Sequence, residues 1–88
     1  MQTPFGIWIP QVTVLRCEHF EKAVDAVDAI RQRQCVVLQL DHLEAAEAQR
    51  VLDFVAGATH ALDGQMERVG DDTYLFAPSG VEVSRLLS

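Results

Sequence analysis

The sequence predicts an α/β fold, an α+β sandwich in which two helices pack on one face of a mixed β-sheet in the order βαβαβββ. Three observations support this prediction. A strand, a helix and a strand follow one another in the first half, and a longer amphipathic helix comes next. Short β-branched or aromatic segments separated by turn residues fill the last third. With 88 residues the chain has the length of a single small domain.

The first strand, helix and strand form one βαβ unit. Residues 12–16 are rich in β-branched side chains, which favours a strand. Residues 35–40 form a nearly continuous apolar run, which is typical of a central strand with both faces covered. The two strands are expected to be parallel and joined by a right-handed crossover. Between them, helical spacing of apolar side chains predicts an amphipathic helix over residues 19–32, from Phe20, Ala23, Val24, Val27 and Ile30.

The second helix is predicted over residues 42–61. Asp41 precedes Glu44 by three residues, which is the spacing of a capping box with aspartate at its first position. Gly64 lies just beyond the helix and is predicted to cap its C-terminus. One apolar stripe marks the face that packs on the sheet, and it consists of Ala48, Val51, Leu52, Val55, Ala58 and Leu62.

The last third of the chain is predicted to be β-structure. Residues 65–69 and 73–77 flank a short turn at residues 70–72, which predicts a hairpin, and residues 81–83 are predicted to form a short final strand. Both faces of the predicted strands carry apolar side chains. Because the helices cover only one face, the other face is a candidate interface between copies.

A second stripe on the long helix contains Arg50, Phe54, Gly57 and Ala61. Glycine inside a helix costs about 1 kcal/mol relative to alanine, so Gly57 calls for a structural reason. Glycine either allows the backbone of another chain to approach closely or fits the helix against its own sheet. The spacing of these residues leaves both interpretations open.

Composition and charge exclude several classes of protein. The chain carries 13 acidic and 7 basic side chains, a net charge of −6, which is unsuited to general nucleic-acid binding and favours a partner with a basic segment. No apolar run approaches the roughly 20 residues that a membrane-spanning helix needs. The two cysteines, in a chain without a recognisable secretory signal, indicate reduced thiols in the cytoplasm.

No catalytic, metal or cofactor site is predicted, and the chain is not expected to be an enzyme. Cys17 and His19 offer a thiol and an imidazole two residues apart, but the sequence has no second pair to complete a zinc site. His42 and His60 would lie about 27 Å apart along one helix. Cys35 begins a buried strand, which favours a small core residue over a nucleophile.

Five short motifs in one register resemble the SepF family. The residues that precede the long helix, Val36-Val37-Leu38-Gln39-Leu40, also match the family's strand at that place. The resemblance covers residues 12–84, and the combination is specific whereas each piece alone is not. The motifs are Ala48-Gln49-Arg50, Asp53-Phe54, Gly57-Ala58-Thr59, Ala61-Leu62-Asp63-Gly64 and Phe76-Ala77-Pro78-Ser79.

The resemblance implies a cell-division adaptor. It implies a core that self-associates, binds the C-terminal tail of FtsZ, and helps to bundle and membrane-tether division filaments during septum formation. Such a protein acts in the cytoplasm, at the division site on the inner face of the membrane. Membrane contact would come only through an N-terminal amphipathic helix, which is not recognisable in this sequence. Gly57 corresponds to the family's helix glycine associated with self-assembly, which favours a self-association role for Arg50, Phe54, Gly57 and Ala61.

The tail of FtsZ is expected in a groove beside the second helix and the hairpin. Tyr74 and Phe76 would supply apolar contacts, Arg68 would meet a carbonyl or carboxylate, and Asp63 would meet a basic end of the tail. The competing interpretations are core aromatics for Phe54 and Phe76 and a solvated surface charge for Arg68.

Two other functions remain open at this point. One is a dimeric βα domain that senses a small molecule, and the other is a purely structural oligomer. The expected organisation is an N-terminal extension at residues 1–11, a core domain at 12–84 and a C-terminal tail at 85–88.

Overall fold

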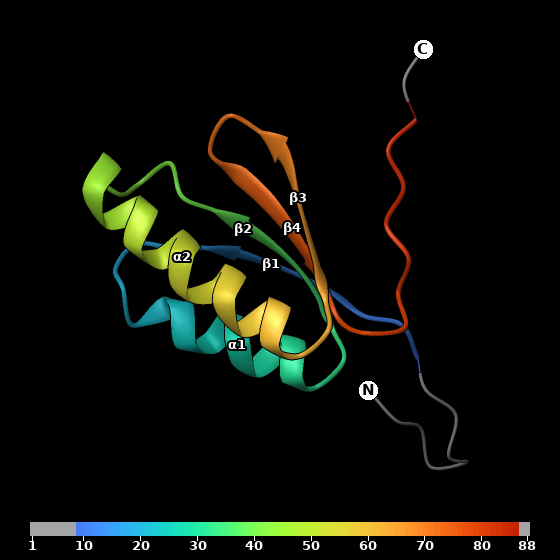
Figure 1. Cartoon of the computed structure of the whole chain (residues 1–88). Helices are drawn as coiled ribbons and strands as arrows, with labels where there is room; N and C mark the ends of the chain where they lie inside the picture. Colours follow the sequence, from blue (N-terminus) through green and yellow to red (C-terminus); the bar gives the residue numbers. More distant parts are fainter. Residues whose placement is uncertain (1–8, 87–88) are drawn as a thin grey trace.

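The computed structural model describes residues 9–86, which form a four-stranded sheet with two helices on one of its faces (Figure 1). The predicted fold class, with two helices on one face of a mixed sheet, is confirmed. Most of the predicted N-terminal extension and the last two residues of the predicted tail lie outside the described residues. The elements are β1 (Val12–Arg16), α1 (Lys22–Arg31), β2 (Cys35–Gln39), α2 (Ala45–Ala61), β3 (Gln65–Gly70) and β4 (Thr73–Ala77).

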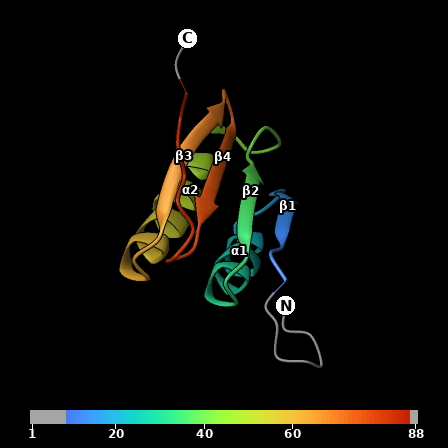
Figure 2. The ribbon, with the colours of Figure 1, turned by 90° about the vertical axis from the view of Figure 1, so that its right-hand side faces the viewer.

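The strands lie in the spatial order β1-β2-β4-β3. β1 and β2 are parallel, with Val14 opposite Val37, as the predicted βαβ unit requires. β4 is antiparallel to both β2 and β3, and Val36 lies opposite Phe76. The view in Figure 2 shows α1 behind β1 and β2 and α2 behind β3 and β4. β1 and β3 are therefore the two edges of the sheet.

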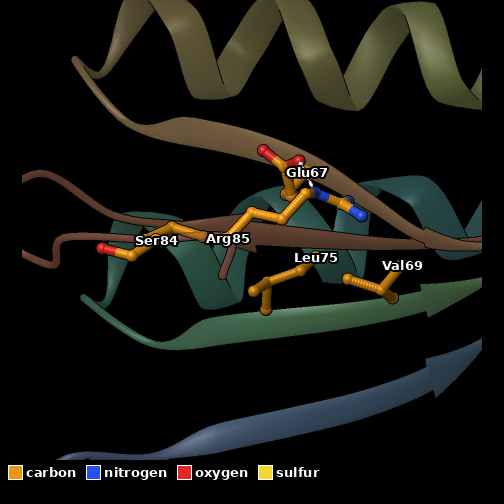
Figure 3. A pocket seen from close by; sticks show the side chains of 6 residues that line it. Glu67, Val69, Leu75, Ser84 and Arg85 are labelled. Carbon is orange, nitrogen blue, oxygen red and sulfur yellow. Dashed lines mark hydrogen bonds and ion pairs between the residues drawn. The ribbon is translucent and has the colours of Figure 1, made fainter. Parts of the chain in front are cut away.

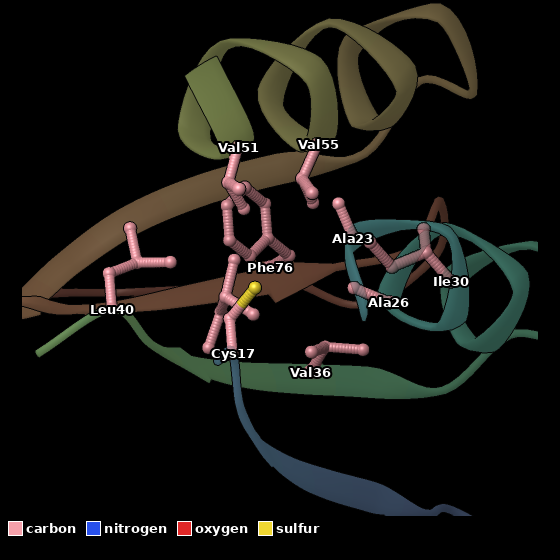
Figure 4. Close-up of a cluster of buried hydrophobic side chains, with 10 residues drawn as sticks. Cys17, Ala23, Ala26, Ile30, Val36, Leu40, Val51, Val55 and Phe76 are labelled. Atoms are coloured by element: carbon pink, nitrogen blue, oxygen red, sulfur yellow. The ribbon is translucent and has the colours of Figure 1, made fainter. Parts of the chain in front are cut away.

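The core lies between the helices and the sheet (Figure 4). Alternation along β2 turns Val36 and Leu38 toward the helices, and both are fully buried. Phe76 on β4 is buried beside them, beneath Val51 and Val55 of α2. Each fully buried side chain of this size contributes roughly 1.5–3 kcal/mol, so this layer supplies most of the folding energy.

The start of α2 differs from the prediction. Glu44 is the N-cap residue and makes no side-chain capping bond, so the predicted capping box is wrong. The carboxylate of Asp41 lies instead 3.8 Å from the guanidinium of Arg16, at the end of β1. The chain also makes a turn before the helix, in which the N–H of Leu43 donates to the carbonyl of Leu40 at 3.2 Å. Because this turn precedes it, α2 begins three residues later than predicted.

The end of α2 is a Schellman motif with aspartate in the left-handed position. Asp63 has a φ of 60°, and its N–H donates to the carbonyl of His60 at 3.0 Å. The N–H of Gly64 donates to the carbonyl of Thr59 at 2.8 Å. Gly64 is thus part of the cap, but glycine is required there because no side chain has room. A Cβ there would lie 2.4 Å from the carbonyl oxygen of Ala77, so only glycine lets the chain turn into β3 at this point.

The predicted final strand at residues 81–83 is absent. Residues 81–86, here called the C-terminal segment, run beside β3 on the side of the sheet opposite the helices (Figures 1 and 2). Side chains dominate its contacts: the N–H of Val83 donates to Oε1 of Gln65 at 3.2 Å, and Arg85 forms an ion pair with Glu67 at 2.8 Å. Arg85 also donates to the carbonyl of Arg68. With these contacts in place of main-chain pairing, no fifth strand forms.

Candidate functional site

The four residues of the predicted second stripe lie together on the exposed side of α2. Arg50, Phe54, Gly57 and Ala61 are all exposed, whereas Val51 and Val55 on the opposite side are buried. A Cβ added at Gly57 would meet nothing within 4 Å. The interpretation that Gly57 fits α2 against its own sheet is therefore wrong. These four residues, together with Phe20, are called the α2 surface below.

An aromatic cluster holds the α2 surface together. The rings of Phe20 and Phe54 have their centroids 5.5 Å apart at an interplanar angle of 48°. The guanidinium carbon of Arg50 lies 5.0 Å from the centroid of Phe20, within range of a cation–π interaction. Phe54 is 41% exposed, so the core interpretation of this ring is wrong as well. Sequence reasoning missed Phe20, because its spacing matched the core face of α1.

A shallow groove of about 160 Å³ lies between the N-terminal half of α2 and β4. Its walls are mainly aliphatic side chains and the ring of Tyr74, with Gln49 and Asp72 as polar members. The hairpin turn is joined to the residue that follows β2, because the N–H of Leu40 donates to the carbonyl of Asp72 at 2.8 Å. We call this feature the α2–β4 groove; its lining residues are Leu40, Ala45, Ala48, Gln49, Leu52, Asp72 and Tyr74.

One of the four residues predicted to bind a peptide, Tyr74, lines this groove. Arg68 lies opposite Tyr74 in the β3–β4 register but is not part of the groove lining. The guanidinium of Arg68 donates to the carbonyls of Gly70 and Asp71 at 3.0 and 2.9 Å, so it also shapes the hairpin turn. Asp63 is exposed but lies beyond the opposite end of α2. Phe76 is wholly buried, so the predicted direct contact of Phe76 with a peptide is wrong.

A second hollow, of about 230 Å³, lies on the opposite face of the sheet (Figure 3). Leu75 and Val69 form its apolar floor, and the ion pair between Glu67 and Arg85 lies beside it. Val83 and Ser84 complete the lining, so the C-terminal segment covers this part of the sheet. The cover extends over β3 and β4, whereas Val12 and Val14 of β1 are 62% and 64% exposed.

The described residues contain no group of three or more histidine, cysteine, aspartate or glutamate side chains placed to hold a metal ion. The thiol of Cys17 donates to the carbonyl of His19 at 3.2 Å rather than to a base. Burial raises the pKa of this thiol, so at neutral pH it is protonated and a poor nucleophile. Within residues 9–86, no helix is both long and apolar enough to cross a membrane.

Comparison with known sequences decides the family. A sequence model described as "Cell division protein SepF" matches residues 12–83. The chain belongs to the SepF family. The SepF protein of Trichormus variabilis is 49% identical over 76 residues, which cover 86% of this chain and 38% of that protein. That of Gloeothece citriformis is 45% identical over 78 residues, covering 89% of this chain and 40% of that protein. The chain thus spans about two-fifths of these relatives.

Solved structures agree on the fold. A SepF-like protein from Archaeoglobus fulgidus superposes with a TM-score of 0.79 at 18% identity, covering 85% of this chain and 93% of that one. The SepF of Methanobrevibacter smithii, solved in complex with FtsZ-CTD, gives a TM-score of 0.69 at 15% identity, covering 86% and 99%. Membership of a cell-division family also confirms the prediction that this SepF chain is not an enzyme.

Proposed function

We propose that this chain is the adaptor core of a SepF protein and that it binds the C-terminal tail of FtsZ in the α2–β4 groove. The observation that carries the proposal is the groove itself, in which aliphatic side chains and the ring of Tyr74 lie beside the polar side chains of Gln49 and Asp72. A neighbour of the same fold, the SepF of Methanobrevibacter smithii, was solved with FtsZ-CTD, which supports the class of ligand. A short extended peptide with aliphatic side chains fits a channel of this size.

The charge of the molecule supports a tail with a basic end. Residues 35–88 contain nine acidic side chains and three arginines, so they carry the whole net charge of −6. Asp72 lies in the groove wall, and Asp71 precedes it in the same hairpin turn. A basic peptide end would be drawn toward this half of the molecule and held near the turn.

Self-association through the α2 surface is the second part of the proposal. Phe54 exposes an aromatic ring, and Gly57 offers a place where a second helix can approach without a side chain between the backbones. Two such surfaces facing each other across a two-fold axis would form an isologous interface. Each assembly would then present more than one groove, so it would link several FtsZ tails and bundle the filaments.

Membrane tethering belongs to the same proposal but not to these residues. It would come from a segment outside the 88 residues and would hold the filaments at the inner face of the membrane during septum formation. The core described here would supply the link between that segment and FtsZ.

The test of the groove is a titration of the chain with a fluorescent peptide that copies the FtsZ tail of the same organism. We expect saturable binding that is lost with a scrambled peptide, and at least tenfold weaker binding by Tyr74→Ala, as for an aromatic anchor. Tyr74→Phe is the matched control and should bind within about threefold of the parent, because it keeps the ring. Equal binding by a folded Tyr74→Ala protein would move the site elsewhere.

The test of the α2 surface is the size of the particle in solution. Gly57→Lys places a long charged side chain where the helices are proposed to meet, so light scattering should give a smaller mass. Gly57→Ala adds only a methyl group into open space and should leave the fold intact. An unchanged mass for Gly57→Lys would remove Gly57 from any interface.

A further inference from the structure

We propose that the free edge of β1 pairs with β1 of a second copy of this chain in antiparallel orientation, which joins two four-stranded sheets into one. The first observation is the position of β1 at the end of the sheet. Among residues 9–86, the backbone bonds of β1 run to β2 alone. An edge strand of this kind offers a row of donors and acceptors for another strand.

The hydrogen bonds at both ends of β1 show which backbone groups face outward. The carbonyl of Gln11 accepts from the N–H of Cys35 at 3.0 Å, and the N–H of Cys17 donates to the carbonyl of Gln39 at 2.9 Å. In a parallel ladder every second residue bonds to the same neighbour. Residues 11, 13, 15 and 17 therefore bond inward to β2. The N–H and carbonyl groups of Val12, Val14 and Arg16 point away from the sheet.

Within residues 9–86, the opposite edge of the same sheet is protected, whereas β1 is not. β3 has an irregular register between Arg68 and Gly70, and the C-terminal segment bonds to its side chains and to the carbonyl of Arg68. Bulges, covers and charged side chains are the usual means of preventing edge-to-edge contact. β1 has five residues without proline, glycine or lysine, and its register with β2 is regular throughout. Its one charged side chain, Arg16, lies at its end, 3.8 Å from the carboxylate of Asp41.

The alternation fixes the register of the proposed pair. In an antiparallel ladder, two residues directly opposite each other exchange both hydrogen bonds when their N–H and carbonyl groups face each other. A two-fold axis at Val14 lets Val14 exchange bonds with Val14 of the second copy. Val12 then exchanges bonds with Arg16 of that copy, and the reverse. In this register every outward N–H and carbonyl group of β1 has a hydrogen-bond partner on β1 of the second copy.

Side chains and charge agree with this register. The side chains of Val12 and Val14 lie on the open face. In the new ladder Val14 would meet Val14 of the second copy, and Val12 would lie opposite Arg16 of that copy, which removes exposed apolar surface from water. The first 34 residues contain four acidic and four basic side chains, whereas the remaining 54 carry the net charge of −6. Contact through β1 therefore brings the neutral halves of two copies together and keeps the acidic halves apart.

Pairing at β1 would add a second interface to the one proposed at the α2 surface. A chain with two different two-fold interfaces forms an assembly larger than a dimer, either a closed dihedral one or an open line. This larger assembly rests on the proposed self-association of α2. The β1 pairing stands without it, because no residue of β1 belongs to the α2 surface.

The experiment is disulfide trapping in the Cys35→Ser background, which removes the half-buried native thiol. In Val14→Cys the two introduced residues would face each other at a Cα distance of about 5.5 Å, within the range of a disulfide. The matched control is Val12→Cys, where the two cysteines would be offset by four residues, about 13 Å along the strands. Under mild oxidation we expect most Val14→Cys chains to run as a dimer on a non-reducing gel and few Val12→Cys chains to do so.

The same trapping in a Gly57→Lys background separates this proposal from the α2 surface. Persistent Val14→Cys dimers there would place the contact at β1, whether or not α2 also associates. Equal trapping of Val12→Cys and Val14→Cys, or none in either, would overturn the proposed register.

Hydrogen exchange of the unmodified chain tests the same pairing without a substitution, so it applies even if a cysteine variant fails to fold. The amide of Val14 should exchange at least tenfold more slowly in concentrated than in dilute samples. The amide of Thr13, which bonds inward to β2, should change little. A Val14 amide that exchanges at the same rate at all concentrations would overturn the pairing.

Discussion

The two edges of the sheet differ in how they meet solvent. At β3 the ladder is irregular near Arg68, and Arg85 of the C-terminal segment binds both a side chain and a carbonyl of this strand. At β1 the ladder is regular, and exposed valines alternate with residues that face the helices. One edge therefore has one backbone carbonyl bound by the C-terminal segment and an irregular ladder, while the outward groups of β1 have no partner among residues 9–86. This difference indicates that a small sheet can prevent strand pairing with another chain at one edge and permit it at the other.

The two helices are also divided between the β3 side and the β1 side of the sheet. α2 covers β3 and β4 and contributes both the α2–β4 groove and the α2 surface, whereas α1 lies behind β1 and β2. The acidic side chains in excess also belong to residues 35–88. Peptide binding is therefore proposed for the acidic half of the molecule, whose sheet is covered by the C-terminal segment. Strand pairing is proposed for the neutral half, which that segment does not cover.

The largest effect is expected from proline at two neighbouring positions of β1. Thr13→Pro removes an inward N–H from the ladder with β2 and the hydroxyl that donates to Oε1 of Gln34 at 2.7 Å, so it should strongly destabilise the fold. Val14→Pro removes an outward N–H and should destabilise the fold much less while abolishing the proposed pairing. Urea unfolding measures both. Similar losses at the two positions would show that the assigned alternation is wrong.

A second comparison places lysine on each edge strand. Val14→Lys should weaken self-association at least tenfold in sedimentation equilibrium, because it brings two ammonium groups together at the proposed axis. Val69→Lys, on a β3 residue that is 53% exposed, should change the association constant by less than about twofold. If both variants associate equally, the two edges do not differ in function.

Arg85→Ala tests whether the C-terminal segment protects β3. The variant loses the ion pair with Glu67 and the bond to the carbonyl of Arg68, a loss of about 0.5–1 kcal/mol for a half-exposed pair. We expect faster hydrogen exchange at β3 with unchanged rates at β1. Arg31→Ala is the control, because Arg31 pairs with Asp28 at 3.8 Å on the surface of α1, away from β3. Unchanged exchange at β3 would mean that this segment gives the edge no protection.

The smallest effect concerns the buried thiol just beyond β1. Burial raises the pKa of Cys17 in the folded chain, so the unfolded chain loses this proton at lower pH. The thiol makes its full contribution to the free energy of unfolding below the pKa of an unfolded cysteine, about 8.5. This contribution falls as the pH rises above that value. Cys17→Ala should remove this part of the slope between pH 8 and 10 in urea unfolding. An identical slope in the variant would assign the effect to other groups.

Sequence periodicity was sufficient for the two helices, the first four strands and part of the candidate site, but not for the predicted final strand. The helical spacing of Val51 and Val55 against Phe54 and Gly57 separated the buried side of α2 from its exposed side. It was not sufficient for the ends of α2. Asp41 has the right spacing for a capping box, but Arg16 lies near its carboxylate, and that contact joins residues distant in sequence.

Tyr74 and Phe76 show what alternation alone does not decide. Both point to the helix side of β4, and both are aromatic, so the sequence treats them alike. Phe76 lies beneath Val51 and Val55 and is fully buried, whereas Tyr74 lines the groove beside α2. Where α2 crosses β4 determines which ring remains available to a peptide.

By itself the sequence determined the two helices, the hairpin, the parallel βαβ unit and the stripe around Gly57, because local periodicity and turn residues encode each of them. Tertiary structure alone decided which strands became edges, since the order β1-β2-β4-β3 places the last strand of the chain inside the sheet. It also decided that the C-terminal segment covers β3 instead of pairing with it. Whether a strand lies at an edge, and whether a segment covers it, depends on contacts between residues distant in the chain. No local pattern of side chains encodes such contacts.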